Sequence, residues 1–343
     1  MRSFIISAYA VAVCTQSVTA WGTLGHQTVG YVAQEFLAPK ALAFVKSSLG
    51  TTYNQSLGAA ASWADSVRSL AAYRWSAPFH FVDAEGESEF LVILGHTLTS
   101  TISKDAPLSG SCSVQETRDC GSGGCILTAI ANYTTRVAQT SLSAAQRQEA
   151  LKFLDHFLGD IGQPLHVEAY EVGGNDISAK CSGKTTNLHA AWDTGMVSKN
   201  IDDNHDGTVT TYAADLVAKI KKGTFKSLTS DWLSCTSITK PASKRFFLSD
   251  APRDVEEDVH RLFSRAEDVA EASVTPLACP LVWAQESNSY CCSVVFTYTM
   301  GQDLCTTSYF TKAVPVIDLQ IAKQGYRLAA WLNVIFDGAT NLP

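Results

Sequence analysis

Residues 156–193 read HFLGDIGQPLHVEAYEVGGNDISAKCSGKTTNLHAAWD. This stretch contains two His-x-x-x-Asp pairs, His156 with Asp160 and His189 with Asp193, and a further histidine, His166. Residues four apart lie on the same face of a helix, so both side chains of a pair can reach one ion. Neutral imidazole and carboxylate are ligands that zinc accepts. The stretch therefore predicts a metal site carried by helices.

The rest of the chain has the composition of a helical globular protein. Its 343 residues are 46% hydrophobic and 17% charged, enough to bury a large core. Periodic apolar residues predict helices over residues 26–49 with a break at Pro39, 62–72, 126–137, 143–163, 187–196, 211–222, 254–272 and 314–336. Residues 78–83 predict an extended segment, and residues 112–125 a loop. Because no repeat or linker divides the chain, we expect one mainly α domain of packed helices.

Residues 1–20 have the features of a signal peptide. Arg2 precedes an apolar run over residues 4–13, and Val18, Thr19 and Ala20 form a small-residue cleavage site. The mature domain would then cover residues 21–343 and begin at Trp21. Since no stretch reaches eighteen apolar residues, none is long enough to span a bilayer. We expect a secreted protein with no membrane association and no obligate protein partner.

Charge and cysteine content agree with a secreted protein. Removal of residues 1–20 takes Arg2 and Cys14 away, which leaves 25 basic and 33 acidic residues, a net charge of −8, and nine cysteines. Cysteines in an oxidising compartment favour disulfides, with an odd one left over. Two sequons predict glycosylation at Asn54 and Asn132. The acidic balance argues against nucleic-acid binding through a broad basic surface, so a phosphate substrate would need a metal to supply positive charge.

Five of the eight histidines lie beside an aspartate at ligand spacing or at the end of a segment: His26, His80, His156, His166 and His189. Singly, each is more readily explained as a structural histidine. Asp65, Asp160 and Asp193 fall on apolar-rich predicted helices, where burial of an unpaired carboxylate costs several kcal/mol. A metal cluster provides partners for all of these residues at once.

Other motifs do not support a different chemistry. The run from Asp202 to Gly207 begins like a calcium loop, but Ala213 stands where a bidentate glutamate is required. The chain lacks Gly-x-Ser-x-Gly and any cysteine in a thiolate-stabilising context, so catalysis by a serine or cysteine nucleophile is not supported.

At this level of detail the sequence resembles the fungal and plant single-strand-specific zinc nucleases of the S-one/P-one type. The matching motifs are Trp21-Gly-x-x-Gly-His26, Ser62-Trp63-Ala64-Asp65-x-x-Arg68, Phe79-His80-Phe81-Val82-Asp83, His156-x-x-x-Asp160-x-x-Gln163-Pro164-Leu165-His166, Gly173-Gly174-Asn175, Asn187-Leu188-His189-x-x-Trp192-Asp193 and Gly325-Tyr326-Arg327-Leu328-Ala329. They extend from Trp21 almost to the C-terminus. The resemblance implies the helical fold of the zinc nucleases and phospholipases C.

The resemblance also implies three zinc ions per chain. The first would be held by Asp65, His80, His156 and Asp160, the second by His166, His189 and Asp193, and the third by His26, a shared Asp160, and the α-amino and carbonyl groups of Trp21. Removal of the signal peptide would itself create the α-amino ligand.

The implied activity is hydrolysis of single-stranded DNA and RNA to 5'-nucleotides, with removal of phosphate from 3'-nucleotides. Zinc lowers the pKa of bound water to about 7, which supplies a hydroxide near neutral pH. Asp65 would orient the nucleophile, and Arg68 would bind a non-bridging phosphate oxygen. The second zinc would bind the phosphate and stabilise the departing 3'-oxygen. The competing interpretation of Arg68 is a surface ion pair.

Base binding is implied at three positions. Phe81 resembles the ring on which a base stacks, Val172 would face it from a nearby loop, and Asp83 would accept hydrogen bonds from the base edge. Stacking contributes about 1–3 kcal/mol per base and tolerates every base. Packing of Phe81 in the core is the competing interpretation.

Two features depart from the resemblance or qualify it. Residues 86–110 exceed the expected length and include an apolar patch, residues 90–94, with no clear period; they are either a surface insertion or translated intron sequence. By resemblance Cys120 pairs with Cys125 and Cys112 with Cys292, although the adjacent Cys291 competes for Cys112.

Two other functions are compatible with the ligand pattern. A zinc phospholipase C has a similar fold and ligand layout but hydrolyses a lipid headgroup bond, and Phe81 and Asp83 favour a base over a lipid. A secreted zinc-binding protein that has lost catalysis is the other possibility, and retention of Arg68 with all nine ligand positions argues against it.

Overall fold

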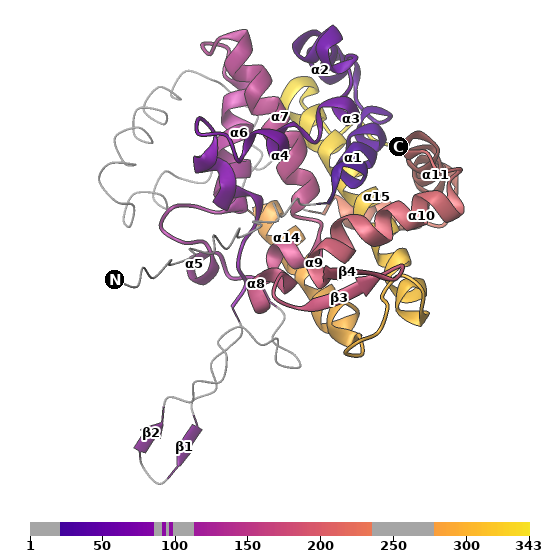
Figure 1. The fold of residues 1–343 in the computed structure, drawn as a ribbon. Coiled ribbons are helices and arrows are strands. Elements are labelled where there is room, and N and C mark those ends of the chain that lie inside the picture. The colour runs from indigo at the N-terminus through magenta and orange to yellow at the C-terminus, as the bar shows by residue number, and fades with distance from the viewer. Residues whose placement is uncertain (1–20, 86–90, 94–95, 99–112, 235–277) are drawn as a thin grey trace, which may run out of the picture.

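In the computed structural model, the described residues are 21–85, 91–93, 96–98, 113–234 and 278–343. They form helices together with two small antiparallel hairpins, so the expectation of a mainly α fold is confirmed (Figure 1). The longer helices are α1 (Thr23–Gln34), α2 (Pro39–Leu49), α6 (Ile126–Ala138), α7 (Ala144–Asp160), α10 (Met196–Asn204), α11 (Val209–Lys222), α14 (Ala278–Ser293) and α15 (Ser308–Asp337). Among these described helices none is long and apolar enough to cross a membrane.

Short elements connect the long helices and carry much of the site described below. They are η1 (Thr51–Tyr53), α3 (Leu57–Ala60), α4 (Trp63–Val67), η2 (Arg74–His80), α5 (Glu116–Asp119), η3 (Pro164–Val167), α8 (Glu171–Gly174), α9 (Leu188–Ala190), η4 (Ala191–Gly195), η5 (Lys226–Leu228), α12 (Thr229–Trp232) and η7 (Val295–Thr297). The hairpins pair β1 (Leu91–Ile93) with β2 (His96–Leu98), and β3 (Ser178–Cys181) with β4 (Lys184–Asn187).

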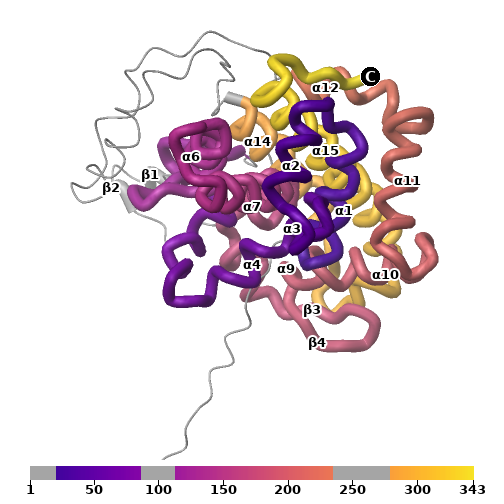
Figure 2. The backbone as a smooth tube through the Cα atoms, turned by 90° about the horizontal axis from the view of Figure 1, so that it is seen from above, coloured from indigo at the N-terminus to yellow at the C-terminus, as the bar shows by residue number. Residues whose placement is uncertain are grey.

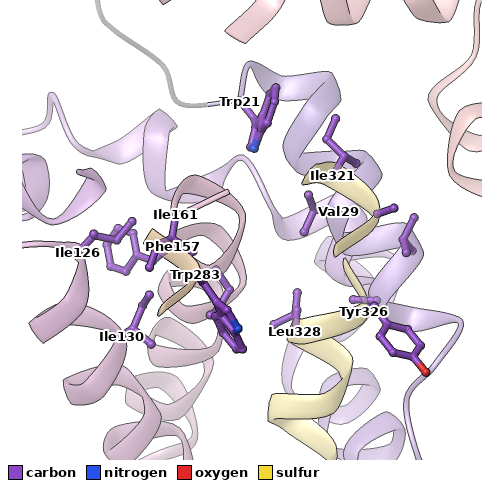
Figure 3. Packing of buried hydrophobic residues seen from close by; sticks show 14 of the residues in the cluster. Trp21, Val29, Ile126, Ile130, Phe157, Ile161, Trp283, Ile321, Tyr326 and Leu328 are labelled. Carbon is purple, nitrogen blue, oxygen red and sulfur yellow. The ribbon is translucent and has the colours of Figure 1, made fainter. Parts of the chain in front are cut away.

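Helix α15 runs through the centre of the molecule and packs against α1, α2, α7, α10 and α11 (Figure 2). Apolar side chains from these helices form one continuous core, in which Val29 of α1 lies beside Ile321 of α15 (Figure 3). Phe157 of α7 and Ile161, which follows α7, lie near Ile126 and Ile130 of α6 (Figure 3). A Cβ atom at Gly325 would lie 2.5 Å from the Val32 side chain, so glycine permits the close approach of α1 and α15. Burial of this apolar surface is the main force that holds the helices together.

Polar side chains buried on α15 also connect it to its neighbours. The Gln320 amide donates to the carbonyl of Gly162 and to the Ser287 hydroxyl, both at 2.8 Å. The indole N–H of Trp331 donates to the Thr134 hydroxyl at 2.8 Å. Because a buried polar group is costly when it lacks a partner, these bonds fix the positions of the packed helices.

Helix α7 begins where the sequence predicts. The Ser143 hydroxyl accepts a hydrogen bond from the backbone N–H of Gln146, and the Gln146 side chain accepts one from the Ser143 N–H, which forms a capping box. All residues from Ala150 to Asp160 are buried, and Pro164 excludes continuation of the helix. The helix therefore carries His156 and Asp160 into the interior.

Three sequence expectations about local structure hold only in part. Of the expected extended segment, residues 78–80 belong to the 3-10 helix η2 (residues 74–80), which tolerates Pro78, whereas the segment is extended from Phe81. The expected loop at residues 112–125 contains α5. The expected helix at residues 187–196 is the short α9 followed by η4, which is a π-helical turn.

Helix α14 and the β3–β4 hairpin have no counterpart among the sequence predictions. Helix α14 buries the polar Ser287 and Asn288 together with Trp283, so its apolar residues do not follow a helical period. The helix expected at residues 254–272 lies outside the described residues. Of residues 86–110, only β1 and β2 are described, so the insertion and intron alternatives both stay open.

The disulfides are partly as expected. Cys120 pairs with Cys125, which confirms that prediction. Cys292 is disulfide-bonded, but Cys112 lies outside the described residues and their pairing stays a prediction. Cys181 pairs with Cys305 across 124 residues, a link that spacing alone could not reveal. Of the two sequons, Asn54 is exposed in a left-handed conformation, and Asn132 is half-buried on α6.

A buried carboxyl on α7 provides a test of this packing. Asp155 is 1% exposed, and neither carboxyl oxygen has a hydrogen-bond partner within the described parts of the chain. Burial raises its pKa well above the usual value. Because an unpaired buried polar group costs about 1–3 kcal/mol, we expect Asp155→Val to stabilise the protein by a similar amount in thermal unfolding.

Asp318 on α15 is the matched control. It is also buried, but its carboxylate accepts hydrogen bonds from Tyr212, Asn200 and Lys219. Asp318→Val should therefore lower the unfolding temperature. A decrease for both variants would contradict the account of Asp155.

Candidate metal centre

The first group of candidate ligands gathers around Asp160 at the end of α7. His26 comes from α1, Asp65 from α4, His80 from the end of η2, and His156 from α7 itself. The Asp160 carboxylate lies between the rings: Oδ1 is 3.0 Å from His26 Nε2, and Oδ2 is 3.0 Å from His80 Nδ1. His156 Nε2 lies 3.3 Å from Asp160 Oδ2. Segments far apart in sequence thus meet at one carboxylate.

Asp65 closes this group on its outer side. Its Oδ1 atom lies 3.6 Å from His156 Nε2 and 3.7 Å from His80 Nδ1. Arg68, three residues later, brings Nη1 to 3.7 Å from the same oxygen, and its side chain is 14% exposed. Asp65 and Arg68 thus lie together at the edge of the buried group.

The second group consists of His166 from η3, His189 from α9 and Asp193 from η4. His189 Nε2 lies 2.9 Å from Asp193 Oδ2, and His166 Nε2 lies 3.9 Å from the same oxygen. The Nε2 atoms of the two histidines are 3.1 Å apart. All three residues are buried.

Backbone carbonyls fix the orientation of three rings. The Nδ1 atom of His166 lies 2.8 Å from the His80 carbonyl, that of His189 lies 2.7 Å from the Gly173 carbonyl, and that of His156 lies 2.7 Å from the Ala61 carbonyl. A carbonyl only accepts, so each Nδ1 carries the proton and each neutral ring has its lone pair on Nε2. This is the usual arrangement around histidine ligands of metals.

These tautomers provide the fit test for a cation. In the second group the Nε2 lone pairs of His166 and His189 face each other at 3.1 Å, with a carboxylate oxygen beside them. Asp65 Oδ1, Asp160 Oδ1 and Asp193 Oδ2 are buried without a hydrogen-bond partner in the described structure. Facing acceptors repel one another unless a proton or a cation lies between them. The residues present therefore fit a bound cation.

The protonation preferences of the first group lead to the same conclusion. Burial lowers the pKa of His80 to about 4, and burial together with His156 lowers that of His26. Burial opposes protonation of His156, yet Asp160 and Asp65 raise its pKa well above the usual value. Two carboxylates, Asp65 and Asp160, thus lie among rings of which two, His26 and His80, have lowered pKa values, and a divalent cation would neutralise their negative charge.

Three sets of residues have ligand atoms within 4.8 Å of one another: His26, Asp65 and His156; His80, His156 and Asp160; and His166, His189 and Asp193. The first two sets share His156, so the described side chains could hold up to three ions. Nitrogen and carboxylate oxygen donors suit zinc. The 3.0 Å distance from His26 to Asp160 is also compatible with the third ligand set expected from the sequence.

Trp21 precedes residues that border each group. Its side chain is fully buried and packs beside Gly25, one residue before His26. The N–H of Gly22 donates to the Asp193 carbonyl at 2.7 Å. Ligation by the backbone groups of Trp21 stays a prediction.

The expected base-binding residues lie on the surface next to the ligands. Phe81 follows His80 and is 37% exposed, so it is not a core residue. The N–H of Val82 donates to the His166 carbonyl at 2.9 Å, which ties this extended segment to the second group. Asp83 is exposed on the same segment, and Val172 is 64% exposed.

Val172 lies in an unusual turn. Glu171, Val172, Gly173 and Gly174 all have positive φ angles, and a left-handed conformation is strained for a β-branched residue. Such strain persists where surrounding contacts enforce it, often at functional sites. The turn exposes Val172 and directs the Gly173 carbonyl at His189, a role that the sequence motif Gly-Gly-Asn did not reveal.

Sequence reasoning also missed two residues that support the second group. The Gln163 amide donates to Asp193 Oδ1, and the Asn187 side chain accepts from the Ala190 N–H at the start of α9. Both belong to motifs quoted above, but neither had a role assigned. Glu168 is buried two residues beyond His166, and burial raises its pKa to about 7.

Comparison with known proteins identifies the family. The sequence model of the family described as S1/P1 Nuclease matches residues 21–337. The chain is 37% identical to Nuclease PA3 from Penicillium sp and to Nuclease P1 from Penicillium citrinum, each over 319 residues that cover 92% of this chain and 97% of the relative. It is 35% identical to Nuclease S1 from Aspergillus oryzae over 338 residues, which cover 97% of this chain and 98% of the relative. The chain therefore belongs to the S1/P1 nuclease family and is a hydrolase of the endonuclease type.

Proposed function

We propose that this chain is a secreted, glycosylated nuclease that holds three zinc ions, hydrolyses single-stranded DNA and RNA to 5'-nucleotides and removes phosphate from 3'-nucleotides. The observation that carries the metal part of the proposal is the pair of unprotonated nitrogens, on His166 and His189, that face each other beside Asp193. Membership of the nuclease family supports the nucleic-acid part.

Bound zinc would supply a nucleophilic hydroxide at neutral pH and positive charge for the phosphate. His26, His80, His156 and Asp160 would hold ions on one side of the site, and His166, His189 and Asp193 on the other. Asp65 lies at the outer edge of the first group. Its carboxylate would accept a hydrogen bond from the nucleophile and so orient it.

Arg68 would bind a non-bridging oxygen of the phosphate. Its guanidinium lies 3.7 Å from Asp65 Oδ1, longer than a hydrogen bond, so its N–H donors are not committed to that carboxylate. A guanidinium at the edge of the buried ligands can compensate the charge of a bound phosphate. An exposed ion pair with Asp65 would contribute little by comparison.

Phe81, Val172 and Asp83 would recognise the base. The half-exposed ring of Phe81 provides a stacking surface next to the ligands, and Val172 would contact the other face of the base. Only an unpaired base can leave its stack to lie there, which accounts for a single-strand preference. An exposed aromatic ring beside the ligands favours a nucleotide over the lipid substrate of a phospholipase C.

The disulfides Cys120–Cys125 and Cys181–Cys305 support an oxidising compartment. We therefore propose secretion, with cleavage before Trp21. That cleavage would free an α-amino group adjacent to Gly22, which lies against Asp193.

Replacement of Asp160 tests the shared ligand. Asp160→Asn removes the charge that lies between His26 and His80, so we expect loss of two zinc ions per chain and a fall in single-strand hydrolysis of at least about 100-fold. Zinc is counted by elemental analysis of the purified variant. Asp318→Asn, which alters a buried carboxylate on the α15 side of the molecule, should retain the zinc content. Three zinc ions and full activity in Asp160→Asn would refute the shared-ligand arrangement.

Replacement of Phe81 tests base stacking. Phe81→Ala should lower kcat/KM for single-stranded DNA by about 5- to 150-fold, the equivalent of about 1–3 kcal/mol, with unchanged zinc content. Trp75→Ala, which removes another half-exposed ring, serves as the control. Equal kcat/KM values for Phe81→Ala and the parent enzyme would rule out the stacking role.

A further inference from the structure

The disulfide between Cys181 and Cys305 joins the β3–β4 hairpin to the segment that precedes α15. Backbone contacts reinforce this junction: the Leu304 N–H donates to the Lys180 carbonyl at 2.8 Å, and the Asp303 carboxylate accepts from the N–H groups of Ser182 and Gly183 at 3.0 and 2.6 Å. The hairpin lies beside α9 in both views of the molecule (Figures 1 and 2). It is therefore anchored at its tip and leads directly into the helix that carries His189.

The sulfur atoms of this disulfide lie directly against η4, the turn that carries Asp193. A Cβ atom at Gly195, the last residue of η4, would lie 2.6 Å from Cys181 Sγ and 3.7 Å from Cys305 Sγ. Strand β3 also packs against η4. No side chain fits between the turn and the disulfide.

Other contacts hold the remaining sides of η4. The Gly22 N–H donates to the Asp193 carbonyl at 2.7 Å, and the Trp192 indole donates to the Tyr309 hydroxyl at 2.8 Å. A π-helical turn is rare in proteins and is usually maintained at functional sites. On the Gly195 side, the turn packs against the disulfide that links β3 to the segment before α15.

We propose that the Cys181–Cys305 disulfide is a positioning device for the second metal group, which holds η4 so that the Asp193 carboxylate meets His189 and His166. The inference rests on the proposed metal centre, because it assigns the disulfide a role in zinc affinity. Groups that orient metal ligands typically change affinity by 10- to 100-fold when they are removed. The disulfide acts through Asp193 and does not touch the metal.

The test compares the zinc-loaded parent enzyme with the Cys181→Ala/Cys305→Ala variant, both as full chains. Each is titrated with a chelator of known affinity, and the zinc retained is counted. We expect the variant to release one of its three ions at a free-zinc level about 10- to 100-fold higher than the parent, with the other two unchanged. If the cross-link only stabilised the fold, its removal would lower the unfolding temperature without selective loss of one ion.

Cys120→Ala/Cys125→Ala is the matched control, because it also removes one disulfide but does not border η4. It should release zinc along the parent curve. A parent enzyme that holds no zinc would refute the proposed metal centre, whereas a parent with three ions and a Cys181→Ala/Cys305→Ala variant with the same release curve would refute the positioning role.

Gly195→Ala gives a second test of the positioning role and keeps the disulfide intact. It tests the proposal even if the double cysteine variant does not fold. The added Cβ would press against Cys181 Sγ and displace η4, so the same ion should be weakened. The shift in zinc release caused by Gly195→Ala should be smaller when both cysteines are also replaced, because the sulfur atoms that the new Cβ would contact are then absent. A parent-like release curve for Gly195→Ala would overturn the proposal.

Discussion

Two unprotonated imidazole nitrogens that face each other at 3.1 Å, on His166 and His189, impose the constraint on which this structure depends. Backbone carbonyls at His80 and Gly173 hold the protons on the opposite nitrogens, so neither ring can turn a donor toward its neighbour. The Asp193 carboxylate lies beside them and also only accepts. A bound cation can therefore satisfy these three side chains, whereas hydrogen bonds among them cannot. In the first group one ring is oriented in the same way, because the Ala61 carbonyl holds the proton of His156 on Nδ1.

The fold supplies the rigidity that such a constraint requires. Helix α7 places His156 and Asp160 one turn apart in the interior, and α15 packs behind it through apolar contacts and buried polar bonds. His26 comes from α1, and the remaining ligands come from the short elements α4, η2, η3, α9 and η4. The carbonyls of Ala61, His80 and Gly173, which lie outside the long helices, accept hydrogen bonds from the rings. Long helices thus provide the frame, and the irregular segments between them orient the ligands.

Much of this arrangement could be predicted from the sequence, and the missing parts have physical causes. Helix α7 was predicted correctly because Ser143 and Pro164 mark its limits and its apolar residues are periodic. Helix α14 was missed because buried Ser287 and Asn288 interrupt the apolar pattern. The histidines and aspartates of the site were identified by spacing and by family resemblance, and the structure brings the side-chain ligands into two groups.

The orienting groups could not be predicted in the same way. The carbonyls of Ala61 and Gly173 belong to the backbone, so no side chain signals their role, and the strained turn at Val172 has no pattern of its own. The Cys181–Cys305 pairing joins residues that are distant in sequence, and spacing does not determine connectivity. Tertiary contacts alone determine these features.

We propose that the buried His and Asp groups hold metal ions. Anomalous X-ray diffraction from crystals of the secreted protein, recorded on both sides of the zinc absorption edge, tests it most directly. We expect three zinc peaks, two among His26, Asp65, His80, His156 and Asp160 and one among His166, His189 and Asp193. Crystals of active enzyme with no anomalous peak between His166 and His189 would contradict it.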